Sequence, residues 1–379
     1  MAEEKKQDDH RGLDGVRGQI DAIDAQMQTL FEERMRCVRE VAEYKAENGL
    51  PIFVPEREHE IIARRVAEVD DRSLAGSAEM FFHTLMDLSK EEQRRYVLHS
   101  AFNQAGQVAF QGVRGAFSEE AVVNTFGECA TPMPCPQFQD VIAAVEDGTA
   151  AYGVLPIENS TGGAINEVYD LLGVSGCMIV GECIVHVHQC LMGLPGSSID
   201  GIRSVYSHPQ GLRQCRHFLD QRNWMEIPYY DTAASAAFVR ETGDASIAAI
   251  ASRRAAEHYG LELLAPPIND RSDNYTRFVV ISLTAIEMPG KGKASMAFTL
   301  KNADESGSLH AVLTHMATRQ FNMTKLESRN IPGDTWEYRF YVDFEGDVRA
   351  ENIAALKRQL SIYTKEIQVL GCYEPAKRG

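Results

Sequence analysis

The N-terminal part of the chain follows a helical pattern of apolar positions. Apolar side chains recur at spacings of three and four between Leu13 and Leu30, which predicts a long amphipathic helix with a seam like that of a coiled coil. Pro51 ends this helix, and Pro55 opens a second one, because proline suits the first turn of a helix. A third helix is predicted to begin with Ser77 as its N-cap.

Polar residues interrupt these apolar stripes. The seam of the first helix passes through Arg34, and Ser89 and Gln93 take inward positions on the third helix. A cation between apolar layers needs an anion. Arg34 could also extend to solvent or pair with a neighbouring acid such as Glu33. Together, however, these side chains indicate a polar pocket inside a helical bundle.

The middle of the chain changes to an α/β pattern. Residues 98–107 are predicted to be a linker, and beyond them strands, one of them at 151–155, alternate with helices, which predicts an α/β domain of two lobes. Polar loops follow strands or open helices at residues 158–161, 207–214, 231–235 and 269–278. Helix N-termini offer free N–H groups to anions, so these loops suit a dicarboxylate. Ser207 and Thr232 could equally be plain N-caps, and 269–278 an ordinary turn.

The C-terminal part has a third pattern. After a linker at residues 286–293, strands are predicted at 295–300, 322–329, 337–344 and 367–372, with helices starting at Ser308 and Val348. The resulting order βαββαβ is that of a ferredoxin-like α+β domain.

Composition narrows the possible partners. A length of 379 residues predicts two or three domains. A net charge of −16 argues against nucleic acid and anionic membranes as partners. The chain has neither a long apolar run nor a signal-peptide pattern, so we expect a cytoplasmic protein. Without Cys-x-x-Cys, a third ligand for His186 and His188, or a glycine-rich nucleotide loop, we expect no metal and no cofactor.

Residues 13–97 resemble the all-helical chorismate mutases, which dimerise through a long first helix. The resemblance implies that Lys45 and Gln93 donate to the ether oxygen of chorismate and that Arg17 reaches the site from the partner subunit. Val54 stands where the family commonly has aspartate. The implied site comprises Arg17, Arg34, Lys45, Arg57, Glu58, Ser89 and Gln93.

Residues 106–284 resemble prephenate dehydratases through the motifs PIENSTGGAIN, YSHPQGLRQC and NYTRFVV. The resemblance implies a two-lobed fold of the periplasmic-binding-protein type with the substrate in its cleft. It makes Thr276 the expected catalytic residue, with Asn159, Ser207 and Gln214 as site partners. Arg277 would bind a carboxylate or brace the loop, and Glu158 and His208 remain candidates for the proton donor.

The C-terminal domain resembles an ACT domain of the dehydratase kind, which binds phenylalanine at a subunit interface. The family signatures GALV and ESRP appear here as GSLH and ESRN. An ACT fold without a phenylalanine response is the alternative. The implied regulatory residues are Gly307, Ser308, Leu309, Glu327, Ser328 and Arg329.

These observations predict a bifunctional enzyme with domains at residues 8–100, 106–285 and 294–376. It would convert chorismate to prephenate and prephenate to phenylpyruvate, respond to phenylalanine, and form a homodimer or a larger homo-oligomer. Two alternatives remain at this point. One is a prephenate dehydratase with an inactive helical dimerisation domain, and the other is a cytoplasmic sensor that binds an amino acid.

Overall fold

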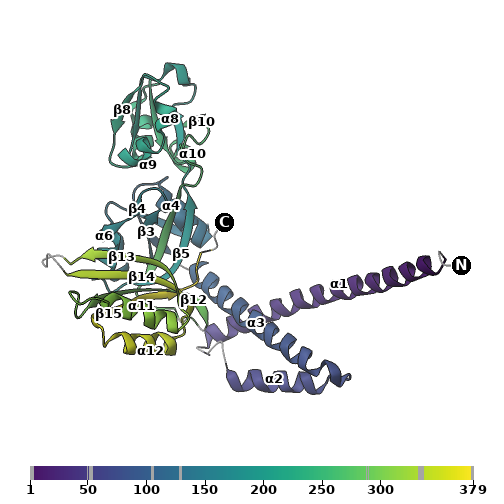
Figure 1. Cartoon of the computed structure of the whole chain (residues 1–379). Helices are drawn as coiled ribbons and strands as arrows, with labels where there is room; N and C mark the ends of the chain where they lie inside the picture. Colours follow the sequence, from purple (N-terminus) through teal and green to yellow (C-terminus); the bar gives the residue numbers. More distant parts are fainter. Residues whose placement is uncertain are drawn as a thin grey trace. The chain divides into compact units, whose positions relative to one another are not determined.

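The chain folds as two compact units, Met1–Phe102 and Asn103–Gly379 (Figure 1). The computed structural model describes residues 4–48, 50, 54–103, 106–127, 130–286, 288, 290–331 and 337–376. No helix in this described part combines the length and the apolar composition that a membrane span requires.

Three helices form the first unit: α1 (Glu4–Glu47), α2 (Pro55–Ala67) and α3 (Ala75–Asn103). The predicted start of the third helix was wrong. The side chain of Asp71 accepts the backbone N–H of Ser73 at 2.9 Å and caps a 3-10 turn that leads directly into α3, so Ser77 lies inside the helix. The predicted linker also starts too early, because no glycine or proline interrupts residues 98–103 and α3 continues through them.

The apolar seam of α1 is exposed in the first unit. Its side chains retain between 47% and 63% of their accessible surface, and they are Leu13, Val16, Ile20, Ile23, Met27 and Leu30. A stripe this regular normally packs against another helix.

Two sheets follow in the second unit. The first has the order β2-β1-β3-β11-β5, with β4 paired to β3, and comprises β1 (Gln107–Gln111), β2 (Thr131–Cys135), β3 (Tyr152–Asn159), β4 (Gly163–Ala164), β5 (Met178–His186) and β11 (Tyr275–Ser282). Its helices are α4 (Phe117–Phe126), α5 (Phe138–Glu146) and α6 (Asn166–Leu172). Strand β11 runs antiparallel between β3 and β5.

The second sheet has the order β10-β6-β9-β7-β8 and forms the other predicted lobe. Its strands are β6 (Cys190–Gly193), β7 (Ser204–Ser207), β8 (Met225–Pro228), β9 (Ile247–Ala251) and β10 (Glu262–Ala265). Its helices are α7 (Pro209–Arg213), α8 (Arg216–Leu219), α9 (Thr232–Thr242) and α10 (Arg253–Tyr259), and a 3-10 turn spans Ile199–Gly201.

Two features of these sheets differ from the sequence prediction. Strand β3 continues past Leu155 to Asn159, so the predicted loop at 158–161 begins inside a strand. Strand β2 was not predicted because its sequence, TPMPC, contains two prolines. It lies at the edge of the sheet, where a missing N–H is tolerated.

The C-terminal domain has the predicted βαββαβ order. It contains β12 (Lys291–Leu300), α11 (Ser308–Thr318), β13 (Asn322–Asn330), β14 (Tyr338–Asp347), α12 (Ala350–Leu360) and β15 (Thr364–Tyr373). The four strands form an antiparallel sheet in the order β13-β14-β12-β15.

Both faces of this C-terminal sheet are covered. On one face, Phe298 and Phe344 pack with residues of α11 and α12. On the other face, Tyr341, Leu370 and Tyr373 belong to the hydrophobic core of the first sheet, together with Val279 and other residues of that sheet. The C-terminal domain and the first sheet therefore share one core.

Gly371 of β15 lies very close to the backbone of β5. A Cβ atom at this position would lie 2.0 Å from the carbonyl oxygen of Ile179. Because backbone atoms cannot move aside as a side chain can, only glycine fits here.

We expect Gly371→Ala to lower the free energy of unfolding of the second unit by about 1–3 kcal/mol, the usual cost of overpacking. Thermal unfolding followed by circular dichroism measures the change. Gly176→Ala is the matched control, because a Cβ there would meet nothing closer than 3.7 Å. Equal melting temperatures for the two variants would contradict the close approach of the two strands.

Candidate active sites

A cavity of about 280 Å³ in the first unit contains most of the residues predicted for its site. We call it the first-unit cavity. Val54 also lines it, at the position expected to have an aspartate. Six of the seven predicted residues contribute to its wall: Arg34, Lys45, Arg57, Glu58, Ser89 and Gln93.

Cations dominate the first-unit cavity. The guanidinium of Arg34 donates to the hydroxyl of Ser89, and burial lowers the pKa of Arg34. Burial also lowers the pKa of Lys45, and the nearby Arg57 acts in the same direction. A cluster of cationic side chains of this kind favours a bound anion.

The first-unit cavity has one further cation that the sequence analysis did not predict. Lys90 lines the cavity and lies 3.0 Å from a carboxylate oxygen of Glu58 and 2.8 Å from one of Asp87. It was missed because it follows Ser89 and lies beside the inward stripe of α3.

Arg17 is the predicted residue that the structure does not bring to the first-unit cavity. Its guanidinium is 3.6 Å from the carboxylate of Asp14, and both side chains are mostly exposed. One copy of the chain therefore supplies six of the predicted residues, and Arg17 lies on the exposed part of α1.

Residues from both sheets line a second cavity of about 390 Å³, which we call the inner pocket. Three predicted site residues contribute to it, namely Asn159, Gln214 and Thr276. The titratable side chains among its described lining residues are His208 and Asp231, and these residues include no lysine or arginine.

A hydrogen bond from Asn159 fixes the role of the Thr276 hydroxyl. The register of β3 and β11 places the two residues opposite each other. Asn159 Nδ2 donates to Thr276 Oγ1 at 2.9 Å, and Asn159 Oδ1 accepts the backbone N–H groups of Thr161 and Gly162 at 3.0 and 2.8 Å. These two acceptor contacts fix the orientation of the amide. Because Thr276 Oγ1 already accepts a hydrogen bond, its own proton is available to a ligand.

The two titratable groups of the inner pocket each accept a hydrogen bond from a backbone N–H. His208 Nδ1 accepts the backbone N–H of Gln210 at 3.2 Å, and burial lowers the pKa of His208. A neutral imidazole with this tautomer keeps its Nε2–H as a donor. Asp231 Oδ1 accepts the backbone N–H of Ala234 at 2.9 Å, and burial raises the pKa of Asp231.

Ser207 does not line the inner pocket. It is completely buried, and its hydroxyl donates to the carbonyl oxygen of Ile250 at 2.6 Å. This hydrogen bond ties the end of β7 to β9, so the contacts of Ser207 are structural.

Arg277 and Glu158 lie on the opposite face of the first sheet from Thr276. Arg277 donates to Glu158 at 2.5 Å, to Glu182 at 2.9 Å and to Asp343 of the C-terminal domain at 2.7 Å. Lys293 also donates to Glu182 at 2.8 Å. Neither Arg277 nor Glu158 lines the inner pocket. The contacts of Arg277 favour the bracing role over binding of a substrate carboxylate.

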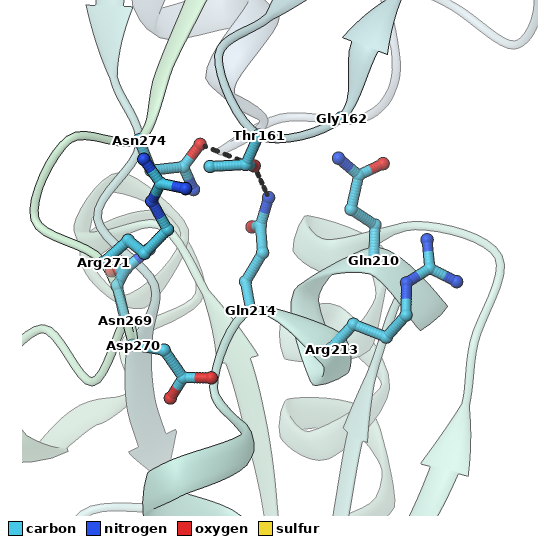
Figure 2. Close-up of a pocket in the computed structure, with 9 residues that line it drawn as sticks. All are labelled: Thr161, Gly162, Gln210, Arg213, Gln214, Asn269, Asp270, Arg271 and Asn274. Carbon is cyan, nitrogen blue, oxygen red and sulfur yellow. Dashed lines mark hydrogen bonds between the residues drawn. The ribbon is translucent and has the colours of Figure 1, made fainter.

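An outer pocket of about 280 Å³ adjoins the inner pocket, and the two share Gly162, Gln210 and Gln214. Figure 2 shows Gln210 and Arg213 on one wall and Arg271, Asn274 and Asp270 on the other. Gln214 lies between them and donates to Thr161 Oγ1 at 3.0 Å. The stretch 269–278 thus contributes to both pockets.

Comparison with known proteins identifies the family. A family model described as chorismate mutase type II matches residues 16–94, and one described as prephenate dehydratase matches residues 108–285. The bifunctional chorismate mutase/prephenate dehydratase of Enterobacter agglomerans is 32% identical over 370 residues, which are 94% of this chain and 95% of that protein. The chain belongs to this bifunctional family.

Two further similarities concern the dehydratase part. Arogenate dehydratase 3 of Arabidopsis thaliana is 39% identical over 287 residues, covering 70% of this chain and 66% of that protein. The structure of the prephenate dehydratase of Arthrobacter aurescens in complex with L-Phe matches with a TM-score of 0.64 and 28% identity, covering 71% of this chain and 89% of that chain.

Family membership confirms both enzyme classes predicted from the sequence, a mutase and a dehydratase of phenylalanine biosynthesis. It favours the bifunctional prediction over an isolated dehydratase and over a sensor without catalytic activity.

The predicted regulatory residues of this bifunctional chain lie at one end of the C-terminal sheet. Gly307 precedes α11 with a φ of +90°, and the hydroxyl of Ser308 donates to the carbonyl oxygen of Asn302 at 2.6 Å. Leu309 is packed against the core of this domain. On β13, Arg329 pairs with Asp170 of the dehydratase part at 2.8 Å, and Glu327 and Ser328 precede it.

We expect Arg277→Gln to lower the free energy of unfolding of the second unit by about 3–5 kcal/mol, because it removes the cation beside the nearly buried carboxylate of Asp343 and leaves Glu182 with Lys293 as its remaining cation. Urea unfolding measures this loss, while chorismate mutase activity should persist. Arg216→Gln is the matched control, since Arg216 also pairs with two carboxylates but is exposed. A small effect at Arg277 equal to that at Arg216 would refute the bracing role.

Proposed function

We propose that the first-unit cavity converts chorismate to prephenate and that the inner pocket converts prephenate to phenylpyruvate. The assignment of the inner pocket rests on the hydrogen bond from Asn159 Nδ2 to Thr276 Oγ1, at 2.9 Å. The described lining of this pocket includes no lysine or arginine. The hydrogen bond leaves the hydroxyl of Thr276 as a donor in a site suited to the loss of a carboxylate.

The mutase reaction needs orientation and charge stabilisation. It is a pericyclic rearrangement, so no nucleophile is required. Arg34 and Arg57 offer planar donor pairs to the two carboxylates of chorismate. In this proposal Lys45 and Gln93, which line the same cavity, donate to the ether oxygen, where negative charge develops. A millionfold acceleration requires about 8 kcal/mol, which preorganised donors can supply.

A second copy of the chain completes the mutase site in this proposal. The exposed seam of α1 offers a regular apolar surface for the α1 helix of another copy. Arg17, which stays outside the cavity of its own chain, would enter the cavity of the partner. The functional enzyme is accordingly at least a homodimer.

The dehydratase reaction expels carbon dioxide and the ring hydroxyl of prephenate. The bond between the ring and its carboxylate breaks, its electron pair enters the ring, and the hydroxyl departs and takes up a proton to become water. Thr276 donates a hydrogen bond to the departing oxygen. His208 and Asp231 line the inner pocket and are the proposed sources of the proton, whereas Glu158 lies on the other face of the sheet. Because the described lining of the pocket includes no lysine or arginine, it does not stabilise the ring carboxylate before that group leaves.

The C-terminal domain acts as an ACT domain that binds phenylalanine and inhibits the dehydratase. Its βαββαβ order and the sequences GSLH and ESRN support this role, as does the solved relative in complex with L-Phe. Gly307, Ser308 and Leu309 would contact the effector together with Glu327, Ser328 and Arg329.

The three domains are proposed at residues 8–100, 106–285 and 294–376. Helix α3 runs slightly beyond the first of these, and β12 begins slightly before the third.

Chorismate given to the purified chain should yield phenylpyruvate, and single substitutions should separate the two steps. Thr276→Ala should lower dehydratase kcat by about 10²–10³, the usual effect of losing one transition-state donor, and leave mutase activity intact. Arg34→Ala should have the converse effect. Thr276→Ser keeps the hydroxyl and serves as the control. Equal loss of both activities in either alanine variant would refute the assignment.

Phenylalanine should inhibit dehydration of prephenate, and the inhibition should weaken in Arg329→Ala because the Asp170 contact and the ESRN segment are altered. Initial rates measured against phenylalanine concentration test this, with tyrosine as the comparison ligand. A rate that is unchanged at every phenylalanine concentration would contradict the regulatory role.

A further inference from the structure

The two connected pockets of the dehydratase differ in charge. The inner pocket has no lysine or arginine among its described lining residues, whereas Arg213 and Arg271 line the outer pocket. Gln210 and Gln214 belong to both. Among the described lining residues, lysine and arginine are therefore confined to the outer pocket, and Thr276 lines the inner one.

Most charged groups of the outer pocket are already engaged. Arg271 forms a two-point contact with Asp273 at 2.9 and 2.7 Å. The carboxylate of Asp270 accepts the backbone N–H groups of Arg216 and His217, each at 2.9 Å. The ion pair neutralises the charge of Arg271, and the two backbone hydrogen bonds fix the position of the Asp270 carboxylate.

Arg213 differs from these neighbours. It is exposed on α7, and among the described residues no hydrogen bond or ion pair engages its guanidinium. Its charge contributes to the lowered pKa of His208, after the larger effect of burial, which places it near the inner pocket. Arg213 is thus a cation that remains available to a ligand.

A buried amide in the same pocket also lacks a partner. Asn274 is only 1% exposed, and its Oδ1 accepts Asn159 Nδ2 at 2.9 Å. Among the described residues its Nδ2 donates to nothing, and Asn274 lines the outer pocket. A buried donor without an acceptor costs free energy that a ligand oxygen would recover.

We propose that Arg213, assisted by the amide of Asn274, binds the side-chain carboxylate of prephenate and thereby orients the substrate. The inference rests on the proposed dehydratase function of this cleft. Prephenate carries its hydroxyl at one end of the ring and its pyruvyl chain at the other. With the chain held in the outer pocket, the hydroxyl reaches Thr276 and the ring carboxylate stays in the pocket without cations.

The side-chain carboxylate survives the reaction, so an anchor on it stabilises substrate and transition state equally. Such uniform binding affects KM and leaves kcat unchanged. A cation on the ring carboxylate would instead stabilise the group that has to leave. Phenylpyruvate retains the side-chain carboxylate and lacks the ring carboxylate. The same reasoning therefore predicts that the affinity for phenylpyruvate also depends on Arg213.

The test compares the full-length chain with Arg213→Gln and with Arg240→Gln, a matched control on the exposed C-terminal turn of α9. We expect Arg213→Gln to raise the KM for prephenate about tenfold. This is a small effect for the loss of a charged contact, because Arg213 is exposed to solvent. The kcat of the dehydratase and the mutase activity should match those of the Arg240→Gln control.

Calorimetric binding of phenylpyruvate decides which carboxylate Arg213 contacts. Its Kd should rise about as much as the KM for prephenate. A raised KM with an unchanged Kd for phenylpyruvate would overturn the proposal, because Arg213 would then contact the ring carboxylate. Unchanged values of both would overturn it as well. Wild-type protein that fails to consume prephenate would refute the proposed function, while phenylpyruvate binding would still decide the role of Arg213.

Discussion

Successive residues of a β-strand point to opposite faces of the sheet, and this alternation governs the dehydratase part of the molecule. On β11, Thr276 lines the inner pocket, whereas Arg277 lies on the other face among three carboxylates. One of them, Asp343, belongs to the C-terminal domain. A single strand therefore forms a wall of the cleft and carries the contact with the proposed regulatory domain, so a shift of that domain would act directly on the strand that bears Thr276.

The two proposed sites differ in the charge that each would present to its dianionic substrate. The first-unit cavity contains Arg34, Lys45, Arg57 and Lys90, which suits a rearrangement in which both carboxylates are retained. The described lining of the inner pocket includes no lysine or arginine, which would suit a reaction that expels one carboxylate. In the proposed function, the distribution of cations would match what each reaction does with its negative charge, although the overall charge of the chain is strongly negative.

The sequence predicted most helices and strands correctly, but it predicted the surroundings of individual side chains less completely. The three helices, the alternation of strands and helices and the βαββαβ order follow from periodicity, and the motif around Thr276 identified a residue of the cleft. Periodicity did not reveal that Asp71, rather than Ser77, leads into α3, because a cap depends on local backbone geometry. Motif membership did not distinguish Ser207 and Arg277 from pocket residues, since only the fold determines which side chains are buried beneath a site. Lys90 was not predicted to line the first-unit cavity because it lies beside the inward stripe of α3, and Asp231 was predicted only as part of the polar loop at 231–235.

The C-terminal domain is separate from the dehydratase part in the sequence but shares a hydrophobic core with it in the fold. In the sequence it is separated from the dehydratase by a short linker, like an independent module. In the fold, Tyr341, Leu370 and Tyr373 complete a core to which Ile179 and Val279 belong, and Gly371 touches the backbone of β5. A gene fragment ending at the linker would encode a dehydratase with an apolar face open to water. The evolutionary addition or loss of this domain therefore requires compensating changes on the surface of the first sheet, so it cannot be exchanged as a freely transferable part.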